Sequence, residues 1–289
     1  MMQDRIFKIV LCIAGFVFFC LIILILAILI KESVPSVRTF GFKFVSGNIW
    51  DPVKEQFGIL PFIVGTLLTS FLALFISLPF SLSLALLLGI YCKEGIVNKL
   101  MGFTTDFLAG IPSVIYGFWG LLFLVPVIRK IEMKFGILPY GVGILTASLV
   151  LAIMIIPYIS SISKEVIKMC PQNLIEAGLS LGATPWDVVK GIVLPYCRSG
   201  IFAGVLLGFG RAFGETMAVT MVIGNSNFMP KSIFGPANTM ASVIANEFTE
   251  ATKDIHLSAL VQIGLWLFFF SMLIYFLGSV VIKRYEVVK

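Results

Sequence analysis

Two opposite charges, Arg211 and Glu215, lie four residues apart within an apolar stretch of the sequence. The stretch covers residues 200–225 and is long enough to cross a bilayer as one helix. A charge in the middle of a span costs at least about 2.5–3.5 kcal/mol on insertion scales, so it usually marks a pathway or a partner. We therefore expect Arg211 and Glu215 to mark a pathway or a partner. A purely structural ion pair at positions i and i+4 is the alternative.

The same helix is expected to have one small face and one bulky face. At about 100° per residue, Gly200, Gly204 and Gly208 share an arc of roughly 80° with the two charges. Small residues at this spacing let a neighbouring helix approach closely. The glycine face should therefore pack inside the protein and carry the charges with it.

Residues 164–199 form a polar segment with helix signals on both sides of a glycine. Gly182 is placed as a left-handed stop at the end of one helix. Thr184 can cap a second helix, with Pro185 at its first position and Asp187 in its first turn. The pattern predicts a helix, a sharp corner and a capped helix at a membrane surface.

This segment resembles the cytoplasmic signature loop of ABC importer permeases. The family pattern is Glu-Ala-Ala, three residues, Gly, nine residues, Ile, one residue, Leu-Pro. The matching positions, with Gly in place of the second Ala, are Glu176, Ala177, Gly178, Gly182, Ile192, Leu194 and Pro195. The resemblance implies a coupling helix that docks into a groove of an ATPase subunit, with contacts at Glu176, Ala177, Gly182 and Ala183. An amphipathic helix resting on the membrane is the alternative.

The span that contains Arg211 and Glu215 makes the resemblance more specific. Residues 210–219 read GRAFGETMAV, which resembles the hallmark of the phosphate-specific ABC importer permeases, and of the PstC-type subunit more than the PstA-type. A second match lies at residues 108–117, which contain the family's Ile-Pro-Ser element. Pro112 and Ser113 predict an interrupted helix that lines the pathway, with a simple packing kink as the alternative. The resemblance covers nearly the whole chain and is weakest before about residue 59.

The elements that must position these residues are membrane helices. With 59% hydrophobic and 12% charged residues in 289, the chain is not a soluble domain. The net charge of +6 suits cytoplasmic loops beside an anionic leaflet and needs no nucleic acid as a partner. We expect an all-α protein with six membrane-spanning helices, at residues 9–30, 60–91, 103–128, 138–163, 200–225 and 257–282.

Two units are expected along the chain. Residues 1–58 form an N-terminal membrane helix followed by a short extracytoplasmic segment at 31–58. Residues 59–289 form the importer domain with its coupling loop at 164–199. Residues 129–138 and 226–256 are expected outside. Because ATPases lie in the cytoplasm, the loop fixes both chain ends inside, in a bacterial or archaeal cytoplasmic membrane.

The chain lacks the residues that would make it an ATPase or another enzyme. No Gly-Lys dipeptide occurs, so the phosphate-binding loop of an ATPase is absent. We therefore expect no cofactor in this chain, with ATP and Mg bound by a partner. The single histidine, His256, is expected in a polar loop without metal-binding partners.

The resemblance implies an import machine with several partners. These are a PstA-like permease, a dimer of PstB-like ATPases, an extracytoplasmic PstS-like phosphate-binding protein and membrane lipid. The resemblance also implies that Arg211, Glu215 and Thr216 line the transport pathway. Arg211 would bind the anion, and Glu215 would hold the guanidinium in place or gate it. Alternatives are an importer for another oxyanion such as sulfate or molybdate, and a stand-alone channel or carrier, which would have no use for the coupling loop.

Overall fold

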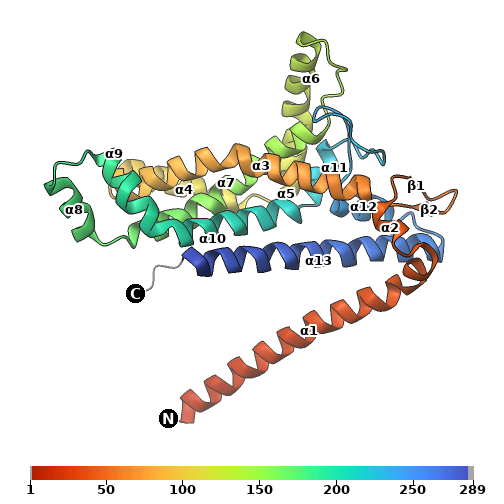
Figure 1. Ribbon diagram of the computed structural model, residues 1–289, viewed down its shortest axis with the longest axis horizontal. Coiled ribbons are helices and arrows are strands. Elements are labelled where there is room, and N and C mark those ends of the chain that lie inside the picture. The colour runs from red at the N-terminus through yellow and green to blue at the C-terminus, as the bar shows by residue number, and fades with distance from the viewer. Residues whose placement is uncertain (1, 286–289) are drawn as a thin grey trace.

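The computed structural model describes residues 2–285, which are mainly helical and contain one two-stranded hairpin. Four long helices run side by side, and α1 leaves them at an angle (Figure 1). They are α3 (Leu60–Leu86), α7 (Ile144–Lys168), α10 (Leu194–Phe213) and α13 (Asp254–Tyr285). By length and composition, six helical segments of the described chain can cross a membrane. The predicted all-α class and the six spans are confirmed.

The first helix is longer than predicted. Helix α1 (Met2–Phe40) continues through Pro35, whereas the sequence suggested an end near residue 30. A serine from α13 provides hydrogen bonds at the point where the proline interrupts those of α1. The Ser258 hydroxyl accepts from the Ser36 amide at 3.1 Å and donates to the Glu32 carbonyl at 2.7 Å. Residues 31–40, expected as the start of the extracytoplasmic segment, therefore continue the first helix.

A compact cap closes the end of the bundle opposite α8 (Gln172–Ser180) and α9 (Pro185–Val188) (Figure 1). It comprises α2 (Lys43–Ser46), β1 (Trp50–Asp51), β2 (Gln56–Phe57) and α12 (Met240–Glu247). Buried aromatic side chains from the first three elements pack beside α12 and α13. The predicted loop at 226–256 therefore includes a helix and the start of α13.

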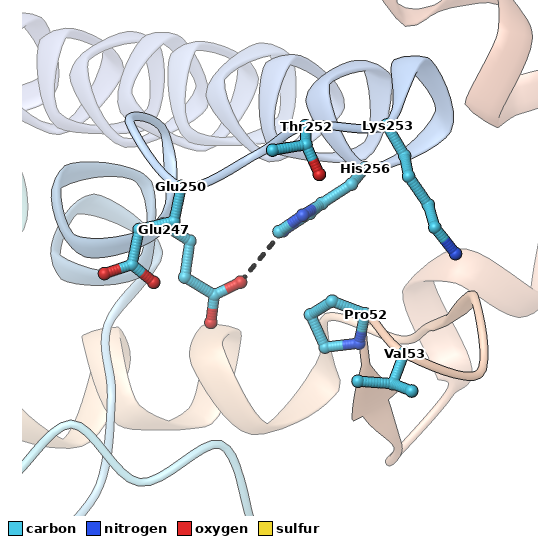
Figure 2. A pocket seen from close by; sticks show the side chains of 7 residues that line it. All are labelled: Pro52, Val53, Glu247, Glu250, Thr252, Lys253 and His256. Carbon is cyan, nitrogen blue, oxygen red and sulfur yellow. Dashed lines mark hydrogen bonds and ion pairs between the residues drawn. The ribbon is translucent and has the colours of Figure 1, made fainter.

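The cap is held by the carboxylate of Glu247. Its Oε2 accepts from Trp50 Nε1 at 2.8 Å and lies 3.0 Å from His256 Nε2, while Oε1 accepts from Asn227 Nδ2 at 3.0 Å. Figure 2 shows Glu247 and His256 at a hollow of about 430 Å³. The histidine is buried in the first turn of α13 and stacks on Phe57, so its expected place in a loop is wrong.

The third span is interrupted, as predicted. Helix α4 (Ile96–Gly110) ends before Ile111 and Pro112, which are extended, and α5 (Ser113–Trp119) follows. A π-helical turn, η2 (Gly120–Leu124), continues it into α6 (Val125–Lys134). The expected outer turn at 129–138 is therefore mostly helical. Buried Glu132 supports this extension because its Oε2 accepts from the Gly141 amide at 2.7 Å.

The core lies where α7 meets α3 and α10. Helix α7 buries a row of apolar side chains, among them Ile155 and Ile159. A Cβ atom added at Gly208 would lie only 2.5 Å from Ile159 Cγ1, so the two helices approach as closely as the glycine face predicted. The coupling segment contains α8 (Gln172–Ser180), α9 (Pro185–Val188) and the π-helical turn η3 (Val189–Val193). A third π-helical turn, η1 (Leu87–Tyr91), ends the α3 span.

Candidate transport site and coupling loop

Arg211 lies in the last turn of α10 and faces an aromatic ring instead of a carboxylate. Its Cζ atom is 4.6 Å from the centre of the Tyr158 ring, which belongs to α7. The Nε atom is buried and has no hydrogen-bond partner in the described part of the chain. A guanidinium on an aromatic face is stabilised as a cation while its N–H groups remain available.

Glu215 does not pair with Arg211, because α10 ends at Phe213. A short break follows, and α11 (Met217–Val222) begins beyond it. The Glu215 Oε1 atom accepts from the Ala218 amide at 3.4 Å, so the side chain caps the new helix. The predicted unbroken helix is wrong here, and the i, i+4 ion pair with it. Residues 2–285 contain no carboxylate within 4.0 Å of the Arg211 guanidinium.

Thr216 lies at the break between α10 and α11. Its hydroxyl donates to the Gly214 carbonyl at 3.3 Å, and its carbonyl accepts from the Thr220 hydroxyl at 2.8 Å. All three predicted pathway residues thus flank one interruption of the span. Arg211 differs from the other two in having a buried donor without a partner.

Two tyrosine hydroxyls bind the end of α4 at the second interruption, which lies at Pro112, and Tyr158 is the one whose ring also contacts Arg211. Tyr116 Oη donates to the Leu108 carbonyl at 2.8 Å, and Tyr158 Oη donates to the Ala109 carbonyl at 3.1 Å. These carbonyls lie in the last turn of α4, where the Leu108 carbonyl also accepts from the Ile111 amide at 3.3 Å and Tyr158 provides the donor for the Ala109 carbonyl. Sequence reasoning missed both tyrosines. The available signal was a phenol group within an apolar run, because a buried hydroxyl in a membrane helix needs a partner.

The half-helices that follow the two breaks pack against each other. A Cβ atom at Gly117 of α5 would lie 2.9 Å from the Ala218 Cα atom of α11 and 2.8 Å from Met221 Sδ. The two half-helices therefore lie directly against each other beyond the breaks. Interrupted helices are tolerated in a membrane where they line a cavity or are buried in protein. Pro112 and Ser113 therefore lie at one of two interruptions whose following half-helices are in contact, and Arg211 lies at the other.

The corner of the coupling segment has the predicted geometry. Gly182 has a φ of +85°, the left-handed conformation that glycine adopts without strain. Thr184 and Asp187 form a reciprocal capping box at the start of α9. The hydrogen bond from the Thr184 side chain, and then the one from its backbone, lower the pKa of Asp187. The corner and the capped helix are confirmed.

The coupling segment exposes the residues singled out for ATPase contact. Glu176, Ala177 and Gly182 are exposed, and Ala183 is half-buried. Two apolar side chains beside them were missed: Leu181 is 89% exposed and Trp186 is 59% exposed. Large apolar side chains that protrude together usually mark an interaction surface.

The departure from the family pattern at Gly178 has a packing explanation. Gly178 is buried in α8, and a Cβ atom there would lie 2.7 Å from Ile192 Cδ1 and 3.1 Å from Val188 Cγ2. The missing methyl group therefore lets α8 lie close to α9 and η3. The coupling segment is a packed unit, which is what transmission of a force requires.

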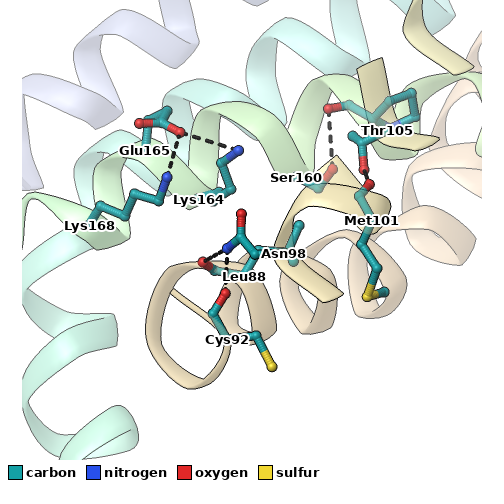
Figure 3. Close-up of polar contacts among 10 residues, drawn as sticks. Leu88, Cys92, Asn98, Met101, Thr105, Ser160, Lys164, Glu165 and Lys168 are labelled. Carbon is teal, nitrogen blue, oxygen red and sulfur yellow. Dashed lines mark hydrogen bonds and ion pairs between the residues drawn. The ribbon is translucent and has the colours of Figure 1, made fainter. Parts of the chain in front are cut away.

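Helix α7 connects this segment to the Arg211 site. Tyr158 lies ten residues before Lys168, the last residue of α7, or about 15 Å along the helix. Figure 3 shows the polar contacts between these points, with Glu165 placed between Lys164 and Lys168 at 3.4 and 3.3 Å. Asn98 of α4 binds the Leu88 carbonyl at 3.1 Å in the same region. A movement of the segment would therefore reach Tyr158 through one continuous helix.

Comparison with known proteins gives consistent matches. The model of the family described as binding-protein-dependent transport system inner membrane component matches residues 81–287. The phosphate transport system permease protein PstC of Mesorhizobium japonicum is 42% identical over 273 residues, which cover 89% of this chain and 83% of that protein. The protein of the same name from Haemophilus influenzae is 39% identical over 301 residues, covering 99% and 95%.

A solved structure supports the fold independently. The inward-facing MetNI methionine ABC transporter aligns with a TM-score of 0.63 at 17% identity, over 83% of this chain and all of that one. At this identity the likeness shows the fold alone, which is that of a type I ABC importer permease. The family match, the PstC relatives and the shared fold show that this chain belongs to the binding-protein-dependent transport system inner membrane components, among the PstC-type permeases.

Proposed function

We propose that this multi-pass inner-membrane protein is the permease subunit of an ATP-driven phosphate importer and forms half of its translocation pathway. One observation carries the proposal: Arg211 lies at a helix interruption inside a span, with a buried N–H donor and no carboxylate partner. An unneutralised guanidinium within the membrane suits an anionic substrate, and phosphate carries about −1.5 charges or more at neutral pH. The PstC relatives support phosphate as that anion.

The assembly has four further members in this proposal. A PstA-like permease completes the pathway, and a PstS-like binding protein delivers phosphate from outside. A dimer of PstB-like ATPases binds ATP and Mg and receives α8, α9 and the exposed side chains of Leu181 and Trp186. Helix α1 begins and α13 ends toward the same side as α8 (Figure 1), which supports a cytoplasmic location for both ends. The terminal residues 1 and 286–289 lie outside the described chain.

Alternating access links these parts. ATP binding closes the ATPases and draws the coupling segments of the two permeases together. That motion reaches the helix interruptions through α7 and opens the pathway to the outside. Phosphate then leaves the binding protein and meets Arg211, and Glu215 keeps α11 capped while the site reorganises. Thr216, Pro112 and Ser113 line the pathway beside it.

Two measurements on the purified complex test the assignment. The chain should co-purify with an ATPase, which neither a stand-alone channel nor a carrier would do. Uptake of labelled phosphate into proteoliposomes should then require ATP and resist competition by sulfate and molybdate. Competition by either oxyanion at equal concentration would assign the importer to that anion instead.

A further inference from the structure

We propose that Tyr158 is a positioning residue for Arg211: its ring sets the guanidinium at the helix interruption, and its hydroxyl fixes the ring to α4. The inference rests on the proposed function, in which Arg211 meets the transported anion. It adds a residue that neither the family pattern around residues 210–219 nor the coupling segment contains.

The first step concerns what an aromatic partner does for Arg211. A carboxylate would occupy the N–H edge of the guanidinium and cancel its charge. An aromatic ring contacts the flat face instead, so the cation is stabilised while its N–H groups still point outward in the guanidinium plane. The 4.6 Å separation from the Tyr158 ring is within the range of such a contact. The buried, unpartnered Nε is consistent with a site that awaits an anion.

The second step excludes the other candidate for this role. Glu215 was the expected partner, but its carboxylate caps α11 through the Ala218 amide. In residues 2–285, the Arg211 side chain forms no ion pair and no hydrogen bond. Tyr158 is therefore the polar or aromatic group that fixes where the guanidinium lies.

The third step concerns what holds the ring. Tyr158 Oη donates to the Ala109 carbonyl at 3.1 Å, one residue before the end of α4. The carbonyl is free because α4 stops at Gly110, before the Pro112 interruption. One side chain thus joins α7, α10 and the end of α4, and the position of Arg211 follows any displacement between these helices.

The structure supplies a matched control in Tyr116. Its hydroxyl donates to the neighbouring carbonyl of Leu108 at 2.8 Å, so it ties α5 to the same end of α4. Among the described residues, the ring that stacks on Arg211 is that of Tyr158. A purely structural tie would make the two tyrosines equivalent, whereas a positioning role makes Tyr158 alone important for transport.

The experiment measures phosphate uptake into proteoliposomes per assembled complex and per ATP hydrolysed. Tyr158→Leu should assemble but lose about tenfold in phosphate transported per ATP. Tyr158→Phe, which keeps the ring, should retain most of this ratio, and Tyr116→Phe should remain within about twofold of the unmodified complex. The Tyr158→Leu substitution should cost clearly less in an Arg211→Lys background, because the two residues act together.

Each other outcome overturns a defined part of the account. An equal loss for Tyr158→Leu in both backgrounds, or the same loss for Tyr116→Leu, would make Tyr158 a structural tie. Normal transport by Tyr158→Leu beside a failure of Arg211→Gln would reject the positioning role and leave the proposed function intact. Normal transport by Arg211→Gln would reject the pathway role of Arg211 itself.

Discussion

Arg211 has the surroundings of a binding group more than those of a structural one. Structural charges inside proteins are usually paired, because an uncompensated buried charge costs several kcal/mol. Here the compensation comes from the Tyr158 ring, a contact worth roughly 0.5–2 kcal/mol depending on desolvation. In the proposed function, an anion that enters would offset the remaining cost, which would couple the substrate to the stability of one conformation.

A double substitution tests whether Arg211 is a binding group or one member of a structural ion pair. Because Glu215 caps α11 and does not neutralise Arg211, removing both charges should not rescue transport. Arg211→Gln and Arg211→Gln with Glu215→Gln should assemble and fail equally in phosphate uptake per complex. Glu215→Gln alone should be mild, since its amide oxygen can still accept from Ala218. Recovery in the double variant would show that the two residues are a structural pair.

At the scale of elements, the corner at Gly182 is the part most sensitive to one side chain. Its φ of +85° strains other residues by roughly 1 kcal/mol or more, although no described residue would clash with a Cβ atom there. Gly182→Asp should therefore insert normally but bind the ATPase more weakly and lower uptake. Gly191, which also has open space around it but no positive φ, provides the control substitution Gly191→Asp. Equal behaviour of both variants in co-purification would contradict a special role for the corner.

The elements that could be predicted are those with local causes. The Gly182 corner and the Thr184 cap depend on residues within a few positions, and both are confirmed. The proline at residue 112 likewise indicated its own helix break. By contrast, the break between α10 and α11 had no such local signal, and the close packing of α5 against Ala218 is visible only in the tertiary structure.

Two other differences between the structure and the prediction also arise from tertiary packing. Helix α1 extends past Pro35 because Ser258, 222 residues from Ser36, completes its hydrogen bonds. His256 is buried because Trp50 and Phe57 of a distant hairpin pack beside it. The ring contact between Tyr158 and Arg211 also joins two helices that no local pattern relates. The two charges of this span could thus be found from the sequence, but their contacts could not.

At the scale of the molecule, Glu247 holds the cap on the bundle. Glu247→Ala would leave the donors of Trp50 and Asn227 without an acceptor, and each lost bond to a charged group costs roughly 1.5–3 kcal/mol. The detergent-solubilised protein should therefore melt at a clearly lower temperature. Glu250 lines the same hollow (Figure 2) and is exposed, so Glu250→Ala is the matched control. Equal melting temperatures for the two variants would contradict the anchoring role.

The orientation of the whole molecule is tested with two exposed positions at opposite ends. Leu181 of the coupling segment is 89% exposed and Val53 of the cap is 86% exposed. In a background without native cysteines, an impermeant thiol reagent added to intact cells should label Val53→Cys and spare Leu181→Cys. The reverse pattern would place the coupling segment outside, where no ATPase could reach it.

The central claim is that Arg211 meets phosphate within the membrane, and uptake in cells that lack the native chain tests it most directly. The complementing variants are Arg211→Gln and Arg211→Lys, each normalised to the complex that co-purifies with its ATPase. We predict normal assembly for both, loss of phosphate uptake for Arg211→Gln, and partial uptake for Arg211→Lys, which keeps the charge but loses the planar fork. Undiminished uptake by the assembled Arg211→Gln complex would contradict the claim.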